Sequence, residues 1–134
     1  MGKARTIAAA SGITLHAGAL VALERGHGRM VALLMESLRQ NRSFHVPAGV
    51  LGQAWRDGRR QAILSRFLRA DNVTVVPLDA AMARAAGELC GHSDTSDVID
   101  ASVVIVARQY GDRIVTSDVN DLRRLDPKAL LVSI

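Results

Sequence analysis

The stretch that decides the fold runs over residues 97–121 and reads DVIDASVVIVARQYGDRIVTSDVND. Its first half predicts an apolar, buried helix that opens with Asp97 and Asp100. Its second half predicts a short strand, followed at once by Asp118 and one turn later by Asp121. In a parallel α/β domain, ligands bind outside the carboxyl ends of the strands, where helices also begin. The stretch therefore predicts a cluster of acids at that edge of a sheet.

Outward from this stretch, short strand-like apolar runs alternate with longer helical ones. This alternation is typical of an α/β fold, in which helices flank a sheet of four to five parallel strands. The expected strands are residues 13–16, 44–46, 73–76, 114–116 and 130–134. The expected helices are residues 17–25, 30–40, 47–55, 59–68, 80–89, 97–110 and 120–125, with a polar loop over 91–96.

Length and composition predict one folded domain over residues 1–134, with residues 1–12 as a flexible N-terminal extension. The chain has 134 residues, of which 49% are apolar, and this is enough to bury a sizeable core. Its single cysteine, Cys90, excludes an internal disulfide, fits the reducing cytoplasm and is expected to be buried. No apolar run approaches the roughly 20 residues that cross a bilayer, or forms the core of a signal peptide, so we expect no membrane contact.

The charge of the chain favours an acidic partner. The net charge is +4 and the pI is about 10.2, a balance that suits contact with RNA phosphates. Arg56, Arg59, Arg60 and Arg66 are predicted to share one polar surface of two successive helices. This surface has two interpretations: a solvated helix face, or a contact surface for RNA or for an acidic segment of a partner protein.

The chemistry of clustered acids points to a cation. Two carboxylates about 4 Å apart repel by about 4 kcal/mol at an effective dielectric constant near 20, unless a proton or a divalent ion lies between them. Oxygen ligands of this kind suit Mg²⁺ or Mn²⁺. Acids at helix starts also serve as N-caps, and this structural interpretation applies to Asp97, Asp100 and Asp121 taken singly. The joint placement of both acid pairs at one edge favours a metal site.

These residues carry a resemblance to a known family. The run DASVVIVAR from Asp100, then Gly111, then IVTSD with Asp121 after it, resembles the C-terminal half of the PIN-domain ribonucleases, the VapC-type toxins of type II toxin–antitoxin systems. The eighteen-residue step from Asp100 to Asp118 matches the spacing of that family. AGALVALE over residues 17–24 resembles the segment after the family's first strand, so the resemblance covers nearly the whole chain.

The resemblance implies a PIN-like three-layer sandwich with an acidic pocket for one or two Mg²⁺ or Mn²⁺ ions. In that family a metal-activated water cuts RNA, and a small antitoxin blocks the pocket. Carried over by position, Asp100 and Asp118 are metal ligands, and Asp121 ligates directly or through water. The residues expected to support these ligands or to orient a water are Asp97, Thr116 and Ser117.

Two departures from the family pattern weaken the expected site. The family has an aspartate at the end of its first strand, where this chain has His16. His16 joins the four aspartates as an expected catalytic residue, and it is either a ligand for Mn²⁺ or the partner of a neighbouring acid. Relatives also commonly carry a glutamate in the helix after strand two, whereas residues 47–56 contain no acid. With both carboxylates lost, we expect weaker metal binding.

Three functions are compatible with this pattern. The first is a metal-dependent endoribonuclease inhibited by a cognate antitoxin, and the second is a catalytically degenerate PIN-like module that binds RNA or an antitoxin without cleavage. The third, a phosphoacceptor or phosphatase domain, needs an aspartate at the end of strand one and ranks last because His16 stands there. Met30 and Met35 are assigned to the core, with a homodimer contact as the alternative.

Overall fold

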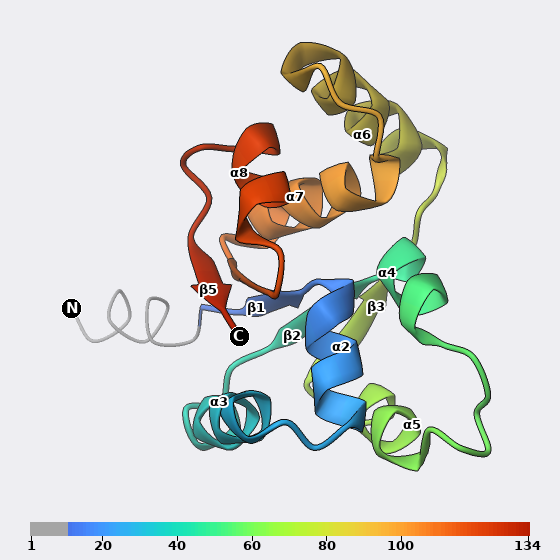
Figure 1. Ribbon diagram of the computed structural model, residues 1–134, viewed down its shortest axis with the longest axis vertical. Helices are drawn as coiled ribbons and strands as arrows, with labels where there is room; N and C mark the ends of the chain where they lie inside the picture. The colour runs from blue at the N-terminus through green and yellow to red at the C-terminus, as the bar shows by residue number, and fades with distance from the viewer. Residues whose placement is uncertain (1–10) are drawn as a thin grey trace.

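The computed structural model describes residues 11–134 and contains a parallel sheet in the order β3-β2-β1-β4-β5 (Figure 1). Each neighbouring pair is parallel, as in Ile13 opposite Phe44 and Thr14 opposite Ile114. The strands are β1 (Ile13–Leu15), β2 (Phe44–Pro47), β3 (Val73–Val76), β4 (Arg113–Thr116) and β5 (Leu131–Ser133). All five lie where the sequence predicts strands.

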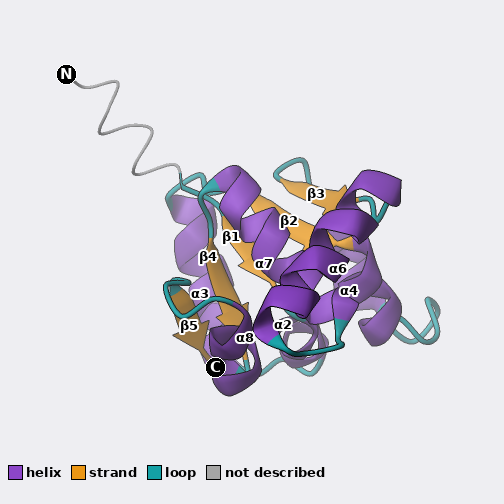
Figure 2. Ribbon diagram, turned by 90° about the horizontal axis from the view of Figure 1, so that it is seen from above, coloured by secondary structure: helices purple, strands orange, loops and turns teal. Residues whose placement is uncertain are grey.

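Helices cover both faces of the sheet. Figure 1 shows α6, α7 and α8 on one side of the strands and α2, α3 and α5 on the other, and Figure 2 shows the same layers from above. The helices are α2 (Ala17–Glu24), α3 (Gly28–Arg39), α4 (Ala48–Ala54), α5 (Ala62–Leu68), α6 (Ala80–Ser93), α7 (Val98–Tyr110) and α8 (Val119–Leu125). The prediction of a three-layer α/β sandwich is confirmed.

The strand order creates a crevice between β1 and β4. The chain builds β1, β2 and β3 outward in one direction, then crosses back over α6 and α7 to place β4 on the other side of β1. Loops leaving the carboxyl ends of β1 and β4 therefore turn to opposite faces of the sheet and leave a gap between them. His16 follows β1 and Ser117 follows β4, so both lie at this gap.

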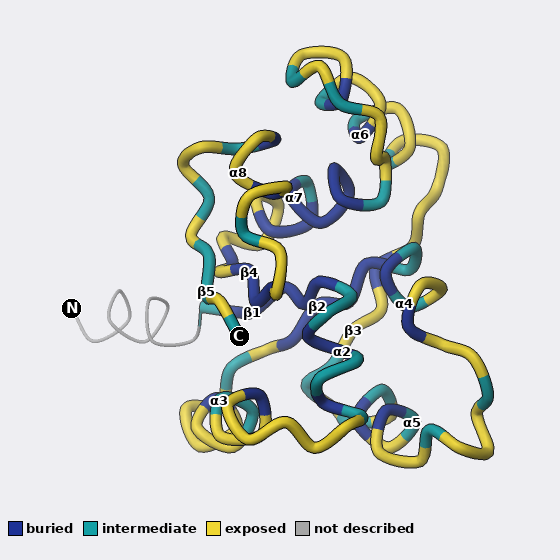
Figure 3. Tube along the Cα trace, viewed as in Figure 1, coloured by how far each residue is buried: buried dark blue, intermediate teal, exposed yellow. Residues whose placement is uncertain are grey.

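The core lies between the sheet and its two helical layers. Helix α7 is buried along most of its length, as the dark segment in Figure 3 shows, because it packs against β1, β2 and β4 as well as against α6. Gly49 of α4 lets Ile99 approach closely: an added Cβ would lie 2.4 Å from the Ile99 side chain. Phe44 and Phe67 meet edge to face with ring centres 5.4 Å apart. Cys90 is buried, as predicted.

A buried polar cluster lies at the opposite end of the sheet from the crevice. The Asp112 side chain, which is fully buried, accepts a 2.7 Å hydrogen bond from the Thr14 hydroxyl and pairs with His45 Nδ1 at 2.6 Å. The His45 ring stacks on Tyr110 with centres 3.8 Å apart. The sequence analysis did not anticipate this cluster, because its members come from three strands or strand ends far apart in the chain.

The structure corrects two predicted helix boundaries. Helix α5 begins at Ala62 and not at residue 59, because side chains of the preceding turn bind its backbone: Asp57 accepts from the Arg59 N–H, and Gln61 accepts from the N–H of Asp57. The predicted loop over 91–96 is shorter, since α6 continues to Ser93 and ends at Asp94 in the left-handed conformation.

Two further predictions concern the surface and the N-terminus. Met30 is fully buried in the core, whereas Met35 is 56% exposed, so the assignment of Met35 to the core is wrong: it lies on the outer face of α3. The predicted flexible extension falls mostly on residues 1–10, outside the described residues, while the carbonyl of Gly12 accepts from the Arg113 N–H. Across residues 11–134 no helix is long and apolar enough to cross a membrane.

Candidate active site

A chain of hydrogen bonds joins Asp100 at the start of α7 to Asp118 after β4. His16 Nε2 lies 2.7 Å from Asp100 Oδ1, and His16 Nδ1 lies 2.8 Å from Thr116 Oγ1. Thr116 Oγ1 also accepts a 2.8 Å hydrogen bond from the Asp118 N–H. The contact between His16 and Asp100 spans 84 residues of sequence. The end of β1, the start of α7 and the end of β4 are thus tied together at one point.

The chain of hydrogen bonds leaves His16 without a free ring nitrogen. A neutral imidazole satisfies every contact if Nε2–H donates to the Asp100 carboxylate and Nδ1 accepts from the Thr116 hydroxyl. His16 is also only 7% exposed. Of the two interpretations of His16, the geometry matches the partner of a neighbouring acid, since both nitrogens that would bind a metal are already occupied.

Asp118 and Asp121 form a second acidic pair one turn apart on α8. Asp118 stands at the N-cap position of α8 without a capping hydrogen bond from its side chain, so its carboxylate is not used by the helix end. A side-chain hydrogen bond with Asp118 raises the pKa of Asp121 above its ordinary value, and the negative charges of Asp118 and Asp100 raise it further. The nearby Arg124 guanidinium acts in the opposite sense. The Asp121 carboxyl group is therefore within the electrostatic influence of both Asp118 and Asp100.

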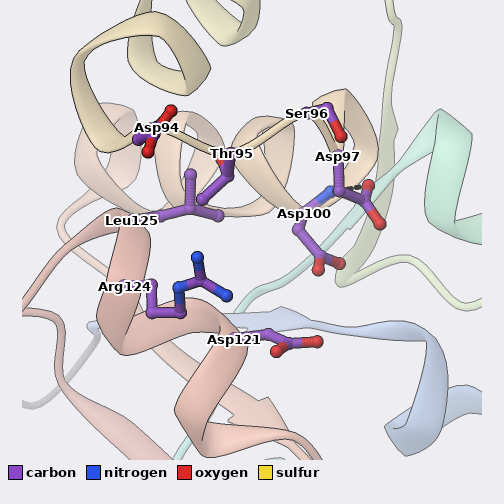
Figure 4. Close-up of a pocket in the computed structure, with 8 residues that line it drawn as sticks. All are labelled: Asp94, Thr95, Ser96, Asp97, Asp100, Asp121, Arg124 and Leu125. Carbon is purple, nitrogen blue, oxygen red and sulfur yellow. Dashed lines mark hydrogen bonds between the residues drawn. The ribbon is translucent and has the colours of Figure 1, made fainter.

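A polar pocket of about 320 Å³ lies beside these acids, between the start of α7 and α8 (Figure 4). Asp97, Asp100 and Asp121 line it, and Figure 4 shows the Arg124 guanidinium extending from α8 into the same space. The remaining lining residues are Asp94, Thr95, Ser96 and Leu125. The pocket combines an acidic wall with one basic group.

Other expected site residues have different placements. Asp97 is the N-cap of α7 and accepts a 3.0 Å hydrogen bond from the Asp100 N–H, so it orients the turn that carries Asp100 (Figure 4). Ser117 faces Gly18 and lines a separate cavity beside α2 with Val21 and Arg25. None of the acids lines that second cavity. Thr116 reaches the acids through its hydrogen bonds, whereas Ser117 is directed elsewhere.

The predicted arginine surface is not helical for most of its length. Arg56, Arg59 and Arg60 lie in the turn between α4 and α5, and only Arg66 lies within a helix. The prediction that these residues share a surface of two helices is therefore wrong, because the side chain of Asp57 organises the turn. None of the four lines the acidic pocket.

The donor set beside the pocket fits a hard divalent cation. Asp100, Asp118 and Asp121 offer carboxylate oxygens, the ligands that Mg²⁺ and Mn²⁺ take. The charges of Asp118 and Asp100 raise the pKa of Asp121 more than the Arg124 guanidinium lowers it. Within residues 11–134, no three His, Cys, Asp or Glu side chains are already grouped as a ligand set. The acids are held as two pairs, and an ion would have to draw the pairs together.

Arg124 is the site residue that the sequence analysis missed. It follows Asp121 by three residues, and residues three apart on a helix share a face. This spacing was a usable signal once Asp121 had been singled out.

The family model described as "PIN domain" matches residues 8–127. No curated protein sequence matches the chain. Solved structures that share its fold include the following three.

The first of these structures is VapBC2 from Rickettsia felis bound to a DNA fragment from its promoter, with a TM-score of 0.67, 17% identity, and coverage of 90% of this chain and 97% of the other. The second is VapC20 from Mycobacterium tuberculosis, described as a toxin that cleaves the sarcin–ricin loop, with a TM-score of 0.61, 18% identity and coverage of 82% and 94%. The third is FitAcB from Neisseria gonorrhoeae, with a TM-score of 0.62, 14% identity and coverage of 90% and 96%.

At such identities the structural likeness establishes the fold alone, while the family model rests on the sequence and covers most of the chain. The sequence match agrees with the five-stranded parallel sheet and with the acids that line the pocket between α7 and α8. This chain belongs to the PIN-domain family.

Proposed function

We propose that this chain is a metal-dependent endoribonuclease of the VapC type, which cleaves RNA phosphodiester bonds. The observation that carries the proposal is the convergence of Asp100 with Asp118 and Asp121 from two distant α/β units at the carboxyl edge of the sheet. Such an arrangement costs free energy unless the carboxylates serve a cation. Membership of the PIN-domain family supports the same reaction class.

Each residue has a distinct role in this proposal. Asp100, Asp118 and Asp121 would hold Mg²⁺ or Mn²⁺, which when bound supplies an activated water and stabilises the leaving oxygen. Asp97 holds the first turn of α7 through the Asp100 N–H, which keeps Asp100 at the pocket. Thr116 fixes the backbone of Asp118 in the same way.

A second candidate function is a PIN-like module that binds RNA or a partner without cleaving RNA. The specific observation in its favour is the 2.7 Å contact between His16 and Asp100. This contact commits one oxygen of Asp100, the buried acid of the pocket, to His16, which stands where the family has a further carboxylate. Metal affinity and turnover would then be low.

One assay separates the two functions. RNA cleavage is measured with Mg²⁺ and with Mn²⁺ for the wild type, His16→Asp and Asp118→Asn, after circular dichroism has shown that each is folded. Cleavage by the wild type that Asp118→Asn abolishes supports the nuclease. Cleavage by His16→Asp alone supports the binding module, and silence of both the wild type and His16→Asp rejects the nuclease proposal.

The partners follow from the same resemblance. We propose an antitoxin as the protein partner, supported by the structural neighbours VapBC2 and FitAcB. The exposed arginines of the α4–α5 turn, Arg59 and Arg60, are proposed to contact RNA phosphates or an acidic segment of that antitoxin, with Arg56 and Arg66 beside them. A cytoplasmic location and a homodimer through the α3 surface around Met35 also remain proposals.

A further inference from the structure

Arg124 is a basic residue in an otherwise acidic pocket. It lines the pocket together with Asp97, Asp100 and Asp121, and its guanidinium occupies the space between α8 and the start of α7 (Figure 4). Asp121 precedes it by three residues on the same helix, so the guanidinium and that carboxylate share one face of α8. The guanidinium is therefore part of the electrostatics of the site.

The guanidinium of Arg124 is not used by the fold. The Arg124 side chain forms no hydrogen bond or ion pair with any residue in 11–134, although carboxylates line the same pocket. By contrast, Arg108 on α7 is paired with Asp126 at 3.2 Å. The five N–H donors of Arg124 thus face the pocket and are available to a ligand.

A phosphodiester that approaches this pocket needs such a group. An RNA phosphate is anionic, and the carboxylates around the pocket repel it. A guanidinium offers two parallel N–H donors that match two phosphate oxygens, whereas the ammonium of a lysine acts as a single point charge. Arg124 is also placed three residues beyond Asp121, so a phosphate that it binds would lie beside the acids.

We propose that Arg124 binds a phosphate group of the RNA substrate inside the acidic pocket and positions the phosphodiester against Asp100 and Asp121. The inference rests on the proposed RNA-directed function, but it concerns binding and does not require that the chain cleaves RNA. It differs from the arginine surface of the α4–α5 turn, whose members lie outside the pocket.

The same position could serve the opposite purpose, with Arg124 as an internal cation that competes with a metal ion. These two roles make opposite predictions for removal of the side chain. If Arg124 binds phosphate, its loss weakens RNA binding. If it replaces the metal, its loss strengthens the binding of Mn²⁺ and leaves RNA binding equal to that of a matched control.

Arg123 is the matched control, because it lies in the same last turn of α8, has the same charge and is exposed, but does not line the pocket. Binding of a 5′-labelled single-stranded RNA oligonucleotide is measured by fluorescence anisotropy in EDTA for the wild type, Arg124→Ala, Arg124→Lys and Arg123→Ala. Melting curves establish that all four are folded. Binding of Mn²⁺ is measured separately by calorimetry.

We expect Arg124→Ala to weaken RNA binding about tenfold, as for the loss of a charge-assisted phosphate contact. It should also lower the slope of log K against log salt by about 0.7, the value for one phosphate of a single strand. Arg124→Lys should recover part of the affinity, and Arg123→Ala should change it less than about twofold.

Two results overturn the inference: equal RNA binding by Arg124→Ala and Arg123→Ala, or no RNA binding by the wild type. Stronger Mn²⁺ binding by Arg124→Ala, with RNA binding like that of Arg123→Ala, would assign the internal-cation role instead. If the wild type binds RNA through Arg124 but never cleaves it with Mg²⁺ or Mn²⁺, the nuclease proposal fails while the inference stands. If the wild type cleaves RNA and Arg124→Ala behaves like Arg123→Ala, the nuclease proposal stands and the inference fails.

Discussion

Replacement of His16 by aspartate should destabilise the metal-free protein and make its stability depend on a bound divalent ion. In the wild type, His16 Nε2 lies 2.7 Å from the buried Asp100 carboxylate, and Thr116 is hydrogen-bonded to the other ring nitrogen. His16→Asp removes a hydrogen bond to a charged group, which contributes about 1.5–3 kcal/mol. It also places a second carboxylate near the first, and repulsion at about 5 Å adds about 3 kcal/mol at an effective dielectric constant of 20.

We therefore expect the metal-free variant to be less stable than the wild type by about 3 kcal/mol or more, since uptake of a proton relieves part of the repulsion. For a domain of this size, that loss lowers Tm by about 11 °C. An ion between the two carboxylates reverses the effect. At a Mn²⁺ concentration of 100 times its Kd, binding restores about 2.7 kcal/mol, which raises Tm by about 10 °C.

Differential scanning fluorimetry with EDTA and with graded Mn²⁺ measures both numbers. His16→Asn is the matched control, because it removes the imidazole without adding a charge: its Tm should fall, and its response to Mn²⁺ should equal that of the wild type. The reasoning is refuted if His16→Asp is as stable as the wild type in EDTA. It is also refuted if Mn²⁺ raises the Tm of His16→Asp no more than that of His16→Asn.

Three further perturbations test other parts of the structure. The pKa of Asp121 is raised from its ordinary 3.8 mainly by Asp118, so the folded state holds that proton more tightly than the unfolded chain and loses stability as the pH rises through the raised pKa. Asp121→Asn should therefore melt above the wild type at pH 7 in EDTA, and the difference should disappear below pH 3.8. Asp112→Ala leaves the buried His45 and Thr14 groups without their acceptor and should cost about 3–5 kcal/mol in urea unfolding, while Asp112→Asn costs less. Gly111 ends α7 with φ +68°, so Gly111→Ala should cost about 1 kcal/mol in the same assay.

The fold was largely predictable because its signals are local. Strands such as residues 73–76 and helices such as α7 are set by the spacing of apolar residues, which any window of a dozen residues displays. Asp79 was predicted to cap α6 from its position alone, and its side chain does accept from the Met82 N–H. Errors arose where side chains compete with the backbone, as Asp57 does ahead of α5.

The edge of the sheet where the acids lie was predictable, but their partners were not. That Asp100 begins a helix and Asp118 follows a strand can be seen in the sequence, and the rule for parallel sheets brings them to one edge. The partner of Asp100 is a different matter. The sequence left open whether His16 would ligate a metal or pair with an acid, and only the geometry shows the pair.

Sequence by itself determined that this chain is an α/β sandwich with acids at the carboxyl edge of a parallel sheet, because hydrophobic periodicity and short-range turn chemistry act within a few residues. The tertiary structure decided that His16 bonds to Asp100, that Asp112 meets His45, and that Arg124 faces the acids. The first two contacts join residues 84 and 67 positions apart, and their geometry depends on how α7 and the strands pack. Packing depends on the whole chain, so only the tertiary structure shows which charged and polar side chains become neighbours.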